Sequence, residues 1–422
     1  MRLLLINNSD QEGGAARAAL RLQAGLHSQG IDSSMLVQIK SGSSPAVVGP
    51  QSSSGTSSIL SGTRLILDKL PLTLSNVKAK SNFSVQWLPD NVSFKIEKMS
   101  PDIINLHWIN NGFIQIESLA KLKKPIVWTL HDMWAFTGGC HYSQECDRYQ
   151  KSCGSCPQLA SQKDRDLSRW VWGRKAKAWQ NLNLTLVSPS NWLADCAKAS
   201  SIFSSYRTEV IPNGIDTTVY KPLDNFFARE VLGLPKDKLL ILFGALSATS
   251  DKRKGFHLLQ PALKILKGSD QADSMELVIF GASEPKEPSD LAFKAHYMDT
   301  LKDDVSLALI YSAADVFVLP SIQDNLPNTI LEALACGLPC VAFNIGGIPD
   351  MVQHHWNGVL AEPYSYEQLA EGINWIIEDS ERQKSMSKNA RESVMSRFTL
   401  QHQSKSYISL FQELEIKFNS SK

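Results

Sequence analysis

The chain has 422 residues, of which 43% are hydrophobic and 20% are charged, and its formal net charge is +1. This composition is typical of a soluble globular protein with two or three domains. The balanced charge does not imply a bulk attraction to nucleic acid, and no apolar run reaches the roughly 20 residues of a membrane helix. The opening residues, MRLLLINN, are too short an apolar stretch for a signal peptide. We therefore expect a cytoplasmic protein without stable disulfides.

Short apolar runs alternate along the chain with helical patterns. A first series of expected strands lies at 2–7, 33–39, 103–108, 125–130, 184–188 and 209–212. A second series lies at 239–246, 276–281, 315–319 and 339–343. Runs of this kind, bounded by Pro and Gly and separated by helices, indicate parallel sheets. Two series predict an α/β protein with two doubly wound domains that face each other.

Turn residues mark the junction between the two series, in PNGIDTTVYKP at 212–222. Residues 41–62 are rich in Ser and Gly, and we expect a flexible surface loop there. The stretch that follows, at 63–80, places Leu and Ile beside Lys. It could contact a membrane or an acceptor, although ordinary packing is the more frequent outcome of such a pattern.

Gly13 and Gly14 follow the first expected strand and open a helix. Glycine lets the backbone approach a ligand closely, and the N–H groups of a helix N-terminus suit a phosphate. The stretch lacks the third glycine and the distal acid of a dinucleotide fingerprint. A tight turn between strand and helix is an equally good interpretation.

His131 stands at the end of the expected strand 125–130. Open α/β sheets bind ligands at the carboxyl ends of their strands. A histidine there can exchange a hydrogen bond with a substrate hydroxyl. A lone histidine is more often structural, and its place at a strand end favours a functional role.

Three basic residues, Lys252, Arg253 and Lys254, follow the expected strand 239–246 and precede Gly255. Basic side chains at this position could neutralise a diphosphate. A solvated basic loop is the alternative interpretation.

Two carboxylates follow the expected strand 315–319: Asp324 in a loop, and Glu332 within an apolar helix. A buried ionised Glu is costly unless it has a partner. Glu332 could accept two hydrogen bonds from a ribose diol, and Asp324 could reach the hydroxyls of a sugar ring. The backbone N–H groups expected to face such a ligand belong to Asn325, Leu326 and Asn328. The alternative is a solvated Asp and a Glu paired with a nearby Lys.

Four cysteines lie within 17 residues: Cys140, Cys146, Cys153 and Cys156. The last two form C-x-x-C. In a cytoplasmic protein, four thiols this close together suggest a structural zinc site. Packed free thiols and a redox-dependent disulfide are the alternatives.

With these motifs, the chain resembles a family 4 retaining glycosyltransferase of the GT-B fold, of the bacterial surface-polysaccharide type. The resemblance runs from Gly13 to NIGGIPDMV at 344–352, and includes HDMW, PSNWLA, PNGID, KG, YSAADVFVLPS and the acid pair. The family's usual pair is Glu and Glu, whereas Asp324 stands first here. The family also tends to place an Arg where this chain has Ala245, and Arg253 is the candidate replacement.

The resemblance implies a division into two Rossmann-like domains with a cleft between them. Residues 1–214 would form the acceptor-side domain and residues 215–397 the nucleotide-sugar-binding domain. Residues 398–422 would form a helix that returns to the N-terminal domain.

The resemblance also implies residue roles: Gly14 close to the diphosphate, Lys254 holding it, and His131 beside the donor sugar. Asp324 would bind sugar hydroxyls, and Glu332 the ribose. The catalytic residues implied are His131, Lys254 and Asp324. The residues implied in nucleotide-sugar binding are Gly13, Gly14, Arg253, Lys254, Tyr297, Met298, Asp324, Asn325, Leu326, Asn328 and Glu332, with the base near Tyr297 and Met298.

The reaction implied is retaining transfer of a sugar, by family frequency glucose from UDP-glucose, to a glycan or lipid-linked acceptor in polysaccharide biosynthesis. No catalytic metal is expected, because Lys, Arg and helix N-termini meet the charge of the leaving diphosphate. The partners implied are a nucleotide sugar and the acceptor, with no nucleic acid, and with peripheral contact with the inner face of the membrane. The alternatives are a GT-B sugar-nucleotide epimerase and a non-catalytic nucleotide-sugar-binding protein.

Overall fold

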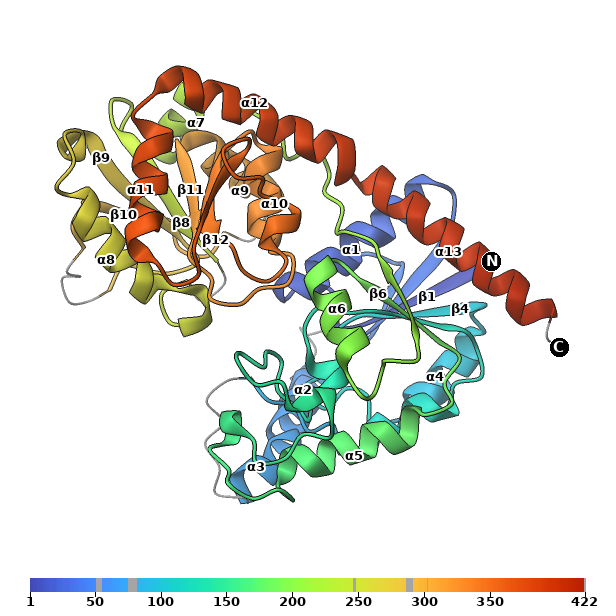
Figure 1. Ribbon diagram of the computed structural model, residues 1–422. Coiled ribbons are helices and arrows are strands. Elements are labelled where there is room, and N and C mark those ends of the chain that lie inside the picture. Colours follow the sequence, from blue (N-terminus) through green and yellow to red (C-terminus); the bar gives the residue numbers. More distant parts are fainter. Residues whose placement is uncertain (51–54, 75–81, 246–247, 286–290, 302, 421–422) are drawn as a thin grey trace. The chain divides into compact units, whose positions relative to one another are not determined.

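The computed structural model describes residues 1–50, 55–74, 82–245, 248–285, 291–301 and 303–420 (Figure 1). The chain divides into two compact units, and each is described by itself. The first unit comprises Met1–Pro212 together with Gln403–Lys422, and the second comprises Asn213–His402.

The first unit contains a parallel seven-stranded sheet in the order β3-β2-β1-β4-β5-β6-β7. Its strands are β1 (Arg2–Ser9), β2 (Asp32–Ile39), β3 (Val47–Val48), β4 (Ile103–Leu106), β5 (Ile126–Thr129), β6 (Leu184–Ser188) and β7 (Arg207–Val210). Its helices are α1 (Gly13–Ser28), α2 (Gly55–Asp68), α3 (Leu70–Leu74), α4 (Val92–Met99), α5 (Leu167–Trp179), α6 (Asn191–Ala199) and most of α13 (Leu400–Ser420). Short 3-10 helices are η1 (Ile116–Lys121), η2 (Trp134–Phe136), η3 (Arg148–Gln150) and η4 (Pro157–Leu159).

Apolar residues cover both faces of this sheet, because successive residues of a strand point to opposite sides. Leu4 and Ile6 of β1 lie in the core cluster of one face. Leu3 and Leu5 lie in that of the other face, together with Phe411 of α13. The last helix of the chain therefore completes a core that begins at the first strand.

The second unit contains a parallel six-stranded sheet in the order β10-β9-β8-β11-β12-β13. Its strands are β8 (Leu239–Gly244), β9 (Met275–Phe280), β10 (Ala295–Tyr297), β11 (Val316–Leu319), β12 (Cys340–Phe343) and β13 (Gly358–Ala361). Its helices are α7 (Asn225–Leu232), α8 (Phe256–Leu266), α9 (Asp304–Ala313), α10 (Asn328–Ala335), α11 (Tyr366–Ile377) and α12 (Ser380–Arg397). Short 3-10 helices are η5 (Lys252–Lys254), η6 (Ala272–Ser274) and η7 (Ile348–Asp350).

Each sheet has a point where its strand order reverses. In the first unit this point lies between β1 and β4, and in the second it lies between β8 and β11. Ligands of doubly wound sheets bind beyond the carboxyl ends of the strands at such a point. The loops that follow these four strands are therefore the places to look for a site.

The ten expected strands are all present, and their parallel pairing confirms two doubly wound α/β units. Three short strands, β3, β10 and β13, were not expected. The expectation of a flexible loop over 41–62 was wrong for part of that stretch. Val47 pairs with Met35 of β2, and α2 begins at Gly55, while residues 51–54 lie outside the described part of the chain. Within the described residues, every helix is too short or too polar to cross a lipid bilayer.

Candidate functional site

The reversal point of the second sheet brings a lysine and an aspartate together. Lys254 ends η5, after β8, and Asp324 lies in the loop after β11. Because β8 and β11 are neighbours, these two loops lie side by side. The Nζ of Lys254 donates a hydrogen bond of 2.7 Å to Oδ2 of Asp324. Nη1 of Arg253 lies 3.2 Å from the same oxygen. The aspartate is therefore buried and ion-paired rather than solvated.

The two basic residues keep Asp324 ionised. Burial acts to raise the pKa of Asp324, but the charges of Lys254 and Arg253 outweigh it and lower that pKa to about 2. Burial lowers the pKa of Lys254, and Asp324 opposes that change. Nη1 of Arg253 also donates to the carbonyl of Gln323 over 3.0 Å. The basic stretch is thus part of a built charged centre, and not a solvated loop.

Two glycines allow the loops to approach this closely. Gly255 has φ +76°, and a Cβ there would lie 1.7 Å from the carbonyl oxygen of Pro320. Gly346 has φ +60°, and its Cβ would lie 2.1 Å from the carbonyl oxygen of Asp324. Any larger residue would force Lys254 and Asp324 apart, because backbone cannot yield as a flexible side chain does.

Glu332 occupies a separate network on α10. It is 2% exposed, and its Oε2 accepts a hydrogen bond of 3.1 Å from the hydroxyl of Tyr311. Burial, and then the Glu332 carboxylate, raise the pKa of Tyr311, so its hydroxyl remains a donor. This bond is to a tyrosine, whereas the alternative interpretation had a lysine as partner. Asp324 and Glu332 therefore hold different partners, as two carboxylates with different roles would.

The other expected residues of the second unit occupy varied positions. The backbone N–H of Asn325 donates to Oδ1 of Asp324 over 3.2 Å, and the Leu326 side chain is part of the core. Asn328 accepts a hydrogen bond of 3.3 Å from Asn213. Tyr297 ends β10, and the N–H of Met298 donates to Ile279 within the sheet over 2.8 Å. That N–H is therefore engaged in sheet pairing.

In the first unit, Gly13 begins α1 with φ +87°, and Gly14 follows it. His131 lies directly beyond β5, as expected. Its Nε2 is 2.9 Å from Nδ1 of His107, and burial lowers its pKa to about 4. His107 was not singled out from the sequence. It too follows a strand directly, β4, at the reversal point of its sheet, and this is the signal that could have found it.

The residues after His131 explain the HDMW motif in structural terms. Asp132 accepts hydrogen bonds from Nε1 of Trp108 over 2.9 Å, from the backbone N–H of Trp134 over 2.9 Å, and from Nδ1 of His141 over 2.6 Å. These contacts lower the pKa of Asp132 despite its burial, which acts to raise it. The charged aspartate thereby anchors the start of the cysteine-rich loop to β4.

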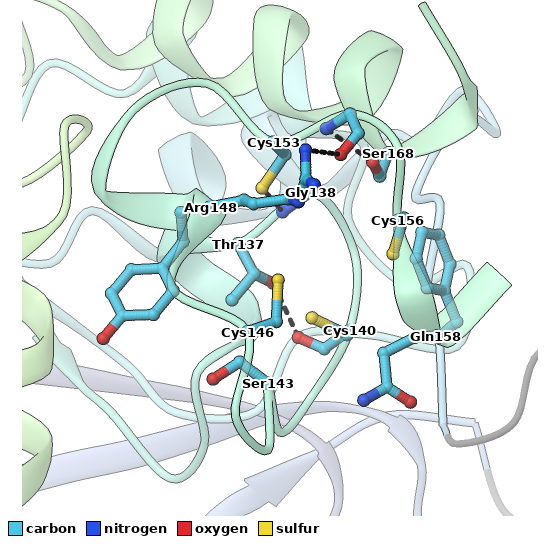
Figure 2. Close-up of a pocket in the computed structure, with 13 residues that line it drawn as sticks. Thr137, Gly138, Cys140, Ser143, Cys146, Arg148, Cys153, Cys156, Gln158 and Ser168 are labelled. Carbon is cyan, nitrogen blue, oxygen red and sulfur yellow. Dashed lines mark hydrogen bonds between the residues drawn. The ribbon is translucent and has the colours of Figure 1, made fainter. Parts of the chain in front are cut away.

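Figure 2 shows the cysteine-rich loop wrapped around one pocket. The four cysteines of the cluster line it: Cys140, Cys146, Cys153 and Cys156. The backbone N–H of Gly138 donates to Sγ of Cys153 over 3.1 Å. Burial raises the pKa of Cys153 to about 12, so this thiol is neutral unless a cation is bound beside it. Two of the four, Cys140 and Cys156, are buried.

A buried lysine stands beside the same pocket. Nζ of Lys175 donates to the carbonyl oxygens of Trp134 and Thr137, and lies 3.6 Å from the centroid of the Trp134 ring. Burial lowers its pKa well below the usual range, and Cys153 and Cys140 oppose that shift. Among the described residues, no three His, Cys, Asp or Glu side chains are already arranged around a common metal position. The donor set fits zinc, while the present arrangement is that of separate thiols.

Two protein-family models match the chain, and together they span most of it. The model described as Glycosyltransferase Family 4 matches residues 12–219. The model described as Glycosyl transferases group 1 matches residues 224–393. Each model therefore matches the greater part of one structural unit.

Two relatives illustrate the similarity at the level of sequence. The chain is 26% identical over 375 residues to a protein of Escherichia coli K12 named as a colanic acid biosynthesis glycosyl transferase, WcaC. The alignment covers 86% of this chain and 88% of the relative. It is 28% identical over 203 residues to an Escherichia coli UDP-Gal:alpha-D-GlcNAc-diphosphoundecaprenol alpha-1,3-galactosyltransferase. This alignment covers 46% of this chain and 51% of the relative.

Solved structures share the fold. Sucrose-phosphate synthase from Thermosynechococcus elongatus superposes with a TM-score of 0.69 at 20% identity, over 98% of both chains. HepE from Anabaena, in complex with UDP-glucose, superposes with a TM-score of 0.58 at 19% identity, over 100% of both chains. At these identities the likeness establishes two Rossmann-like domains of the GT-B type.

Proposed function

The chain belongs to the group 1, family 4 glycosyltransferases, and from that premise we propose that it transfers a sugar from a UDP-sugar to a growing surface polysaccharide. The observation that carries this proposal is the buried centre of Lys254, Arg253 and Asp324 at the reversal point of the second sheet. Glucose is the proposed sugar, and HepE, which shares the fold, is the relative seen with UDP-glucose. A lipid-linked acceptor is proposed from the name of the galactosyltransferase relative.

In the proposed chemistry, the two carboxylates bind different parts of the nucleotide sugar. Glu332, held by Tyr311, binds the ribose diol. Asp324 binds hydroxyls of the transferred sugar, and also holds Lys254 in position. Lys254 and Arg253 meet the negative charge that grows on the diphosphate as it leaves, which is stabilisation aimed at the transition state. We propose that the sugar is transferred with retention and without a catalytic metal ion.

In the first unit, the proposal places His131 beside the transferred sugar and Gly13 and Gly14 close to the diphosphate. Each of these residues follows a strand at its carboxyl end. We also propose that the first unit binds the acceptor and the second binds the nucleotide.

The test begins with binding. A ligand that binds only the folded protein raises its stability with the logarithm of the ligand concentration over Kd, so at equal concentration the tightest ligand gives the largest shift. UDP, UDP-glucose, UDP-galactose and GDP-mannose should therefore be compared by thermal shift, and a UDP-sugar should give the largest shift. Product analysis follows, with and without a diphosphoundecaprenol-linked glycan. A nucleotide sugar converted to its epimer without an acceptor would instead indicate an epimerase, and no shift with any nucleotide sugar would contradict the proposal.

Peripheral membrane contact is proposed for the exposed apolar side chains of α2 and α3. Ile66 and Leu74 are 71% and 77% exposed, and Leu67, Lys69 and Leu70 are exposed near them. Apolar side chains beside a lysine favour an anionic lipid surface. Co-sedimentation with vesicles containing phosphatidylglycerol should fall when Ile66 and Leu74 are both changed to Ser.

We also propose that the cysteine pocket binds a structural zinc ion. Four thiolates around zinc carry a net negative charge, which would favour the protonated form of Lys175 against the effect of its burial. The N–H group of Gly138 already donates to one of the four sulfurs. Zinc would fix the shape of the loop that begins just after His131 and would take no part in the reaction.

A further inference from the structure

Hydrogen bonds connect Asn105, His107 and His131. Nε2 of His131 is 2.9 Å from Nδ1 of His107, and Nε2 of His107 is 3.0 Å from Oδ1 of Asn105. The two imidazole rings are stacked, with centroids 5.2 Å apart. His107 and Asn105 are buried, so solvent cannot replace either bond.

Asn105 sets the direction of the series. Its Nδ2 donates to the carbonyl oxygen of Val127 over 3.0 Å, and a carbonyl can only accept. The same nitrogen donates to Oγ1 of Thr129 over 3.0 Å. The amide is thereby oriented with Oδ1 toward His107. Because Oδ1 can only accept, Nε2 of His107 must carry a proton.

The proton positions then follow from one ring to the next. Burial, and then His131, lower the pKa of His107, so its ring is neutral and Nδ1 carries the lone pair. That lone pair can only accept, so Nε2 of His131 must carry a proton. Burial lowers the pKa of His131 to about 4, against the opposing charge of Asp132. His131 is therefore also neutral, and its Nδ1 carries the lone pair.

We propose that Asn105 and His107 are positioning residues that hold His131 in the Nε2–H tautomer, so that its Nδ1 accepts a hydrogen bond from a hydroxyl of the bound sugar. The sugar rests on the proposed function; the tautomer rests on the hydrogen bonds and on the neutrality of the two buried rings. A histidine held in this tautomer selects a ligand group that donates a hydrogen bond to Nδ1, because a lone pair cannot bind a group that only accepts hydrogen bonds.

Two further contacts hold the series in place. Nε1 of Trp128 donates to the carbonyl oxygen of His107 over 3.1 Å, which anchors the backbone. Oγ1 of Thr129 is 2.8 Å from the hydroxyl of Tyr407 on α13. The second contact is not needed for the direction of the series, because Val127 alone orients the amide of Asn105.

Nuclear magnetic resonance on the full chain, labelled with 15N-histidine, tests the tautomer without any substrate. Long-range proton–nitrogen correlations at pH 7 should show the Nε2–H form at both His107 and His131, with each ring assigned by its loss in a His→Gln variant. A protonated ring, or the Nδ1–H form, at His131 would overturn the proposal. This result stands whether or not the protein uses a nucleotide sugar.

Matched variants test the positioning role. His107→Gln can still present one acceptor to His131 and one donor to Asn105, and should keep the Nε2–H form of His131 and nearly all activity. His107→Phe fills the space but offers no acceptor, and should lose that tautomer and about tenfold in kcat/KM. His257→Phe, at an exposed histidine of the second unit, is the control and should change neither. Equal losses in the Gln and Phe variants of His107, with both folded, would contradict the positioning role.

Discussion

Nζ of Lys254 lies 2.7 Å from Oδ2 of the buried Asp324. If Lys254 meets the charge of the leaving diphosphate, Lys254→Met should lower kcat by about 100-fold with a smaller change in KM, because the charge is greatest in the transition state. Lys252→Met removes an exposed lysine of the same stretch and is the matched control. Comparable rates in the two variants would remove Lys254 from the proposed mechanism. Wild-type activity should also persist in EDTA.

The same pair predicts how stability depends on pH. Lys254 and Arg253 lower the pKa of Asp324 from an ordinary 3.8 to about 2. The ionised carboxylate therefore stabilises the fold above about pH 4, and this contribution is lost as the pH falls through about 2. Asp324→Asn should cost about 2 kcal/mol at pH 7. The free energy of unfolding, measured in urea between pH 2 and pH 5, should depend less steeply on pH in the variant than in the wild type. An equal dependence on pH in both proteins would contradict the assignment.

Glu332 and Asp324 should differ in their effect on UDP itself. Glu332→Ala should weaken UDP binding by about 1.5–3 kcal/mol, because it removes charged hydrogen bonds to the ribose. Asp324→Ala should leave UDP affinity nearly unchanged and lower turnover. Calorimetry with UDP measures both. Tyr311→Phe controls for the loss of the buried bond to Glu332, and equal losses of UDP affinity in the two acid variants would show that they do not divide the donor.

Gly255 is predicted to be irreplaceable for a backbone reason. Gly255→Ala would place a Cβ 1.7 Å from the carbonyl oxygen of Pro320, at a positive φ, and should lower both the melting temperature and activity. Gly173→Ala is the opposite case. It lies inside α5 with nothing within 4 Å of a Cβ, and it should raise stability by about 0.5–1 kcal/mol. Thermal unfolding of the two variants compares them directly.

The cysteine pocket predicts about one zinc per chain in protein purified without chelator. Cys153→Ser should lower zinc content and melting temperature together, and leave UDP affinity unchanged. Cys196→Ser, outside the cluster, is the control and should keep the metal. Zinc is measured by elemental analysis. Four freely titrating thiols in fully active, zinc-free enzyme would show that the pocket holds packed thiols instead.

The fold was predictable wherever apolar runs were long enough to mark a buried parallel strand. β3 and β10 were not predicted because a strand of two or three residues is too short to form a recognisable apolar run. Val47–Val48 is an example, since it lies within a stretch of Ser and Gly. The order of the strands was not predictable residue by residue. It is that order, with β8 beside β11, that turns two separate loops into the contact between Lys254 and Asp324.

The candidate site was predictable in its residue types and not in its partners. Asp324 was placed in the correct loop, but its pairing with Lys254 depends on a contact across 70 residues of sequence. The base is expected near Tyr297 and Met298, and the hydrogen bond from the Met298 N–H to Ile279 is a sheet contact that the sequence did not predict. His107 was missed because a histidine beside a tryptophan at a strand end resembles ordinary packing. Asn105, a polar residue inside an apolar strand, was the neglected signal of a buried hydrogen-bond network.

Helix α13 has a consequence for the order in which the protein is made. Its residues Tyr407 and Phe411 complete the core around Leu3 and Leu5, yet they leave the ribosome after all of residues 213–402. Domains usually mature from the N-terminus during synthesis. Here the second unit, whose residues are contiguous, can fold before the first unit does. The first unit is translated earlier, but part of its core stays exposed until α13 is made. A chain truncated after residue 402 would therefore contain one complete domain and one whose core lacks Tyr407 and Phe411.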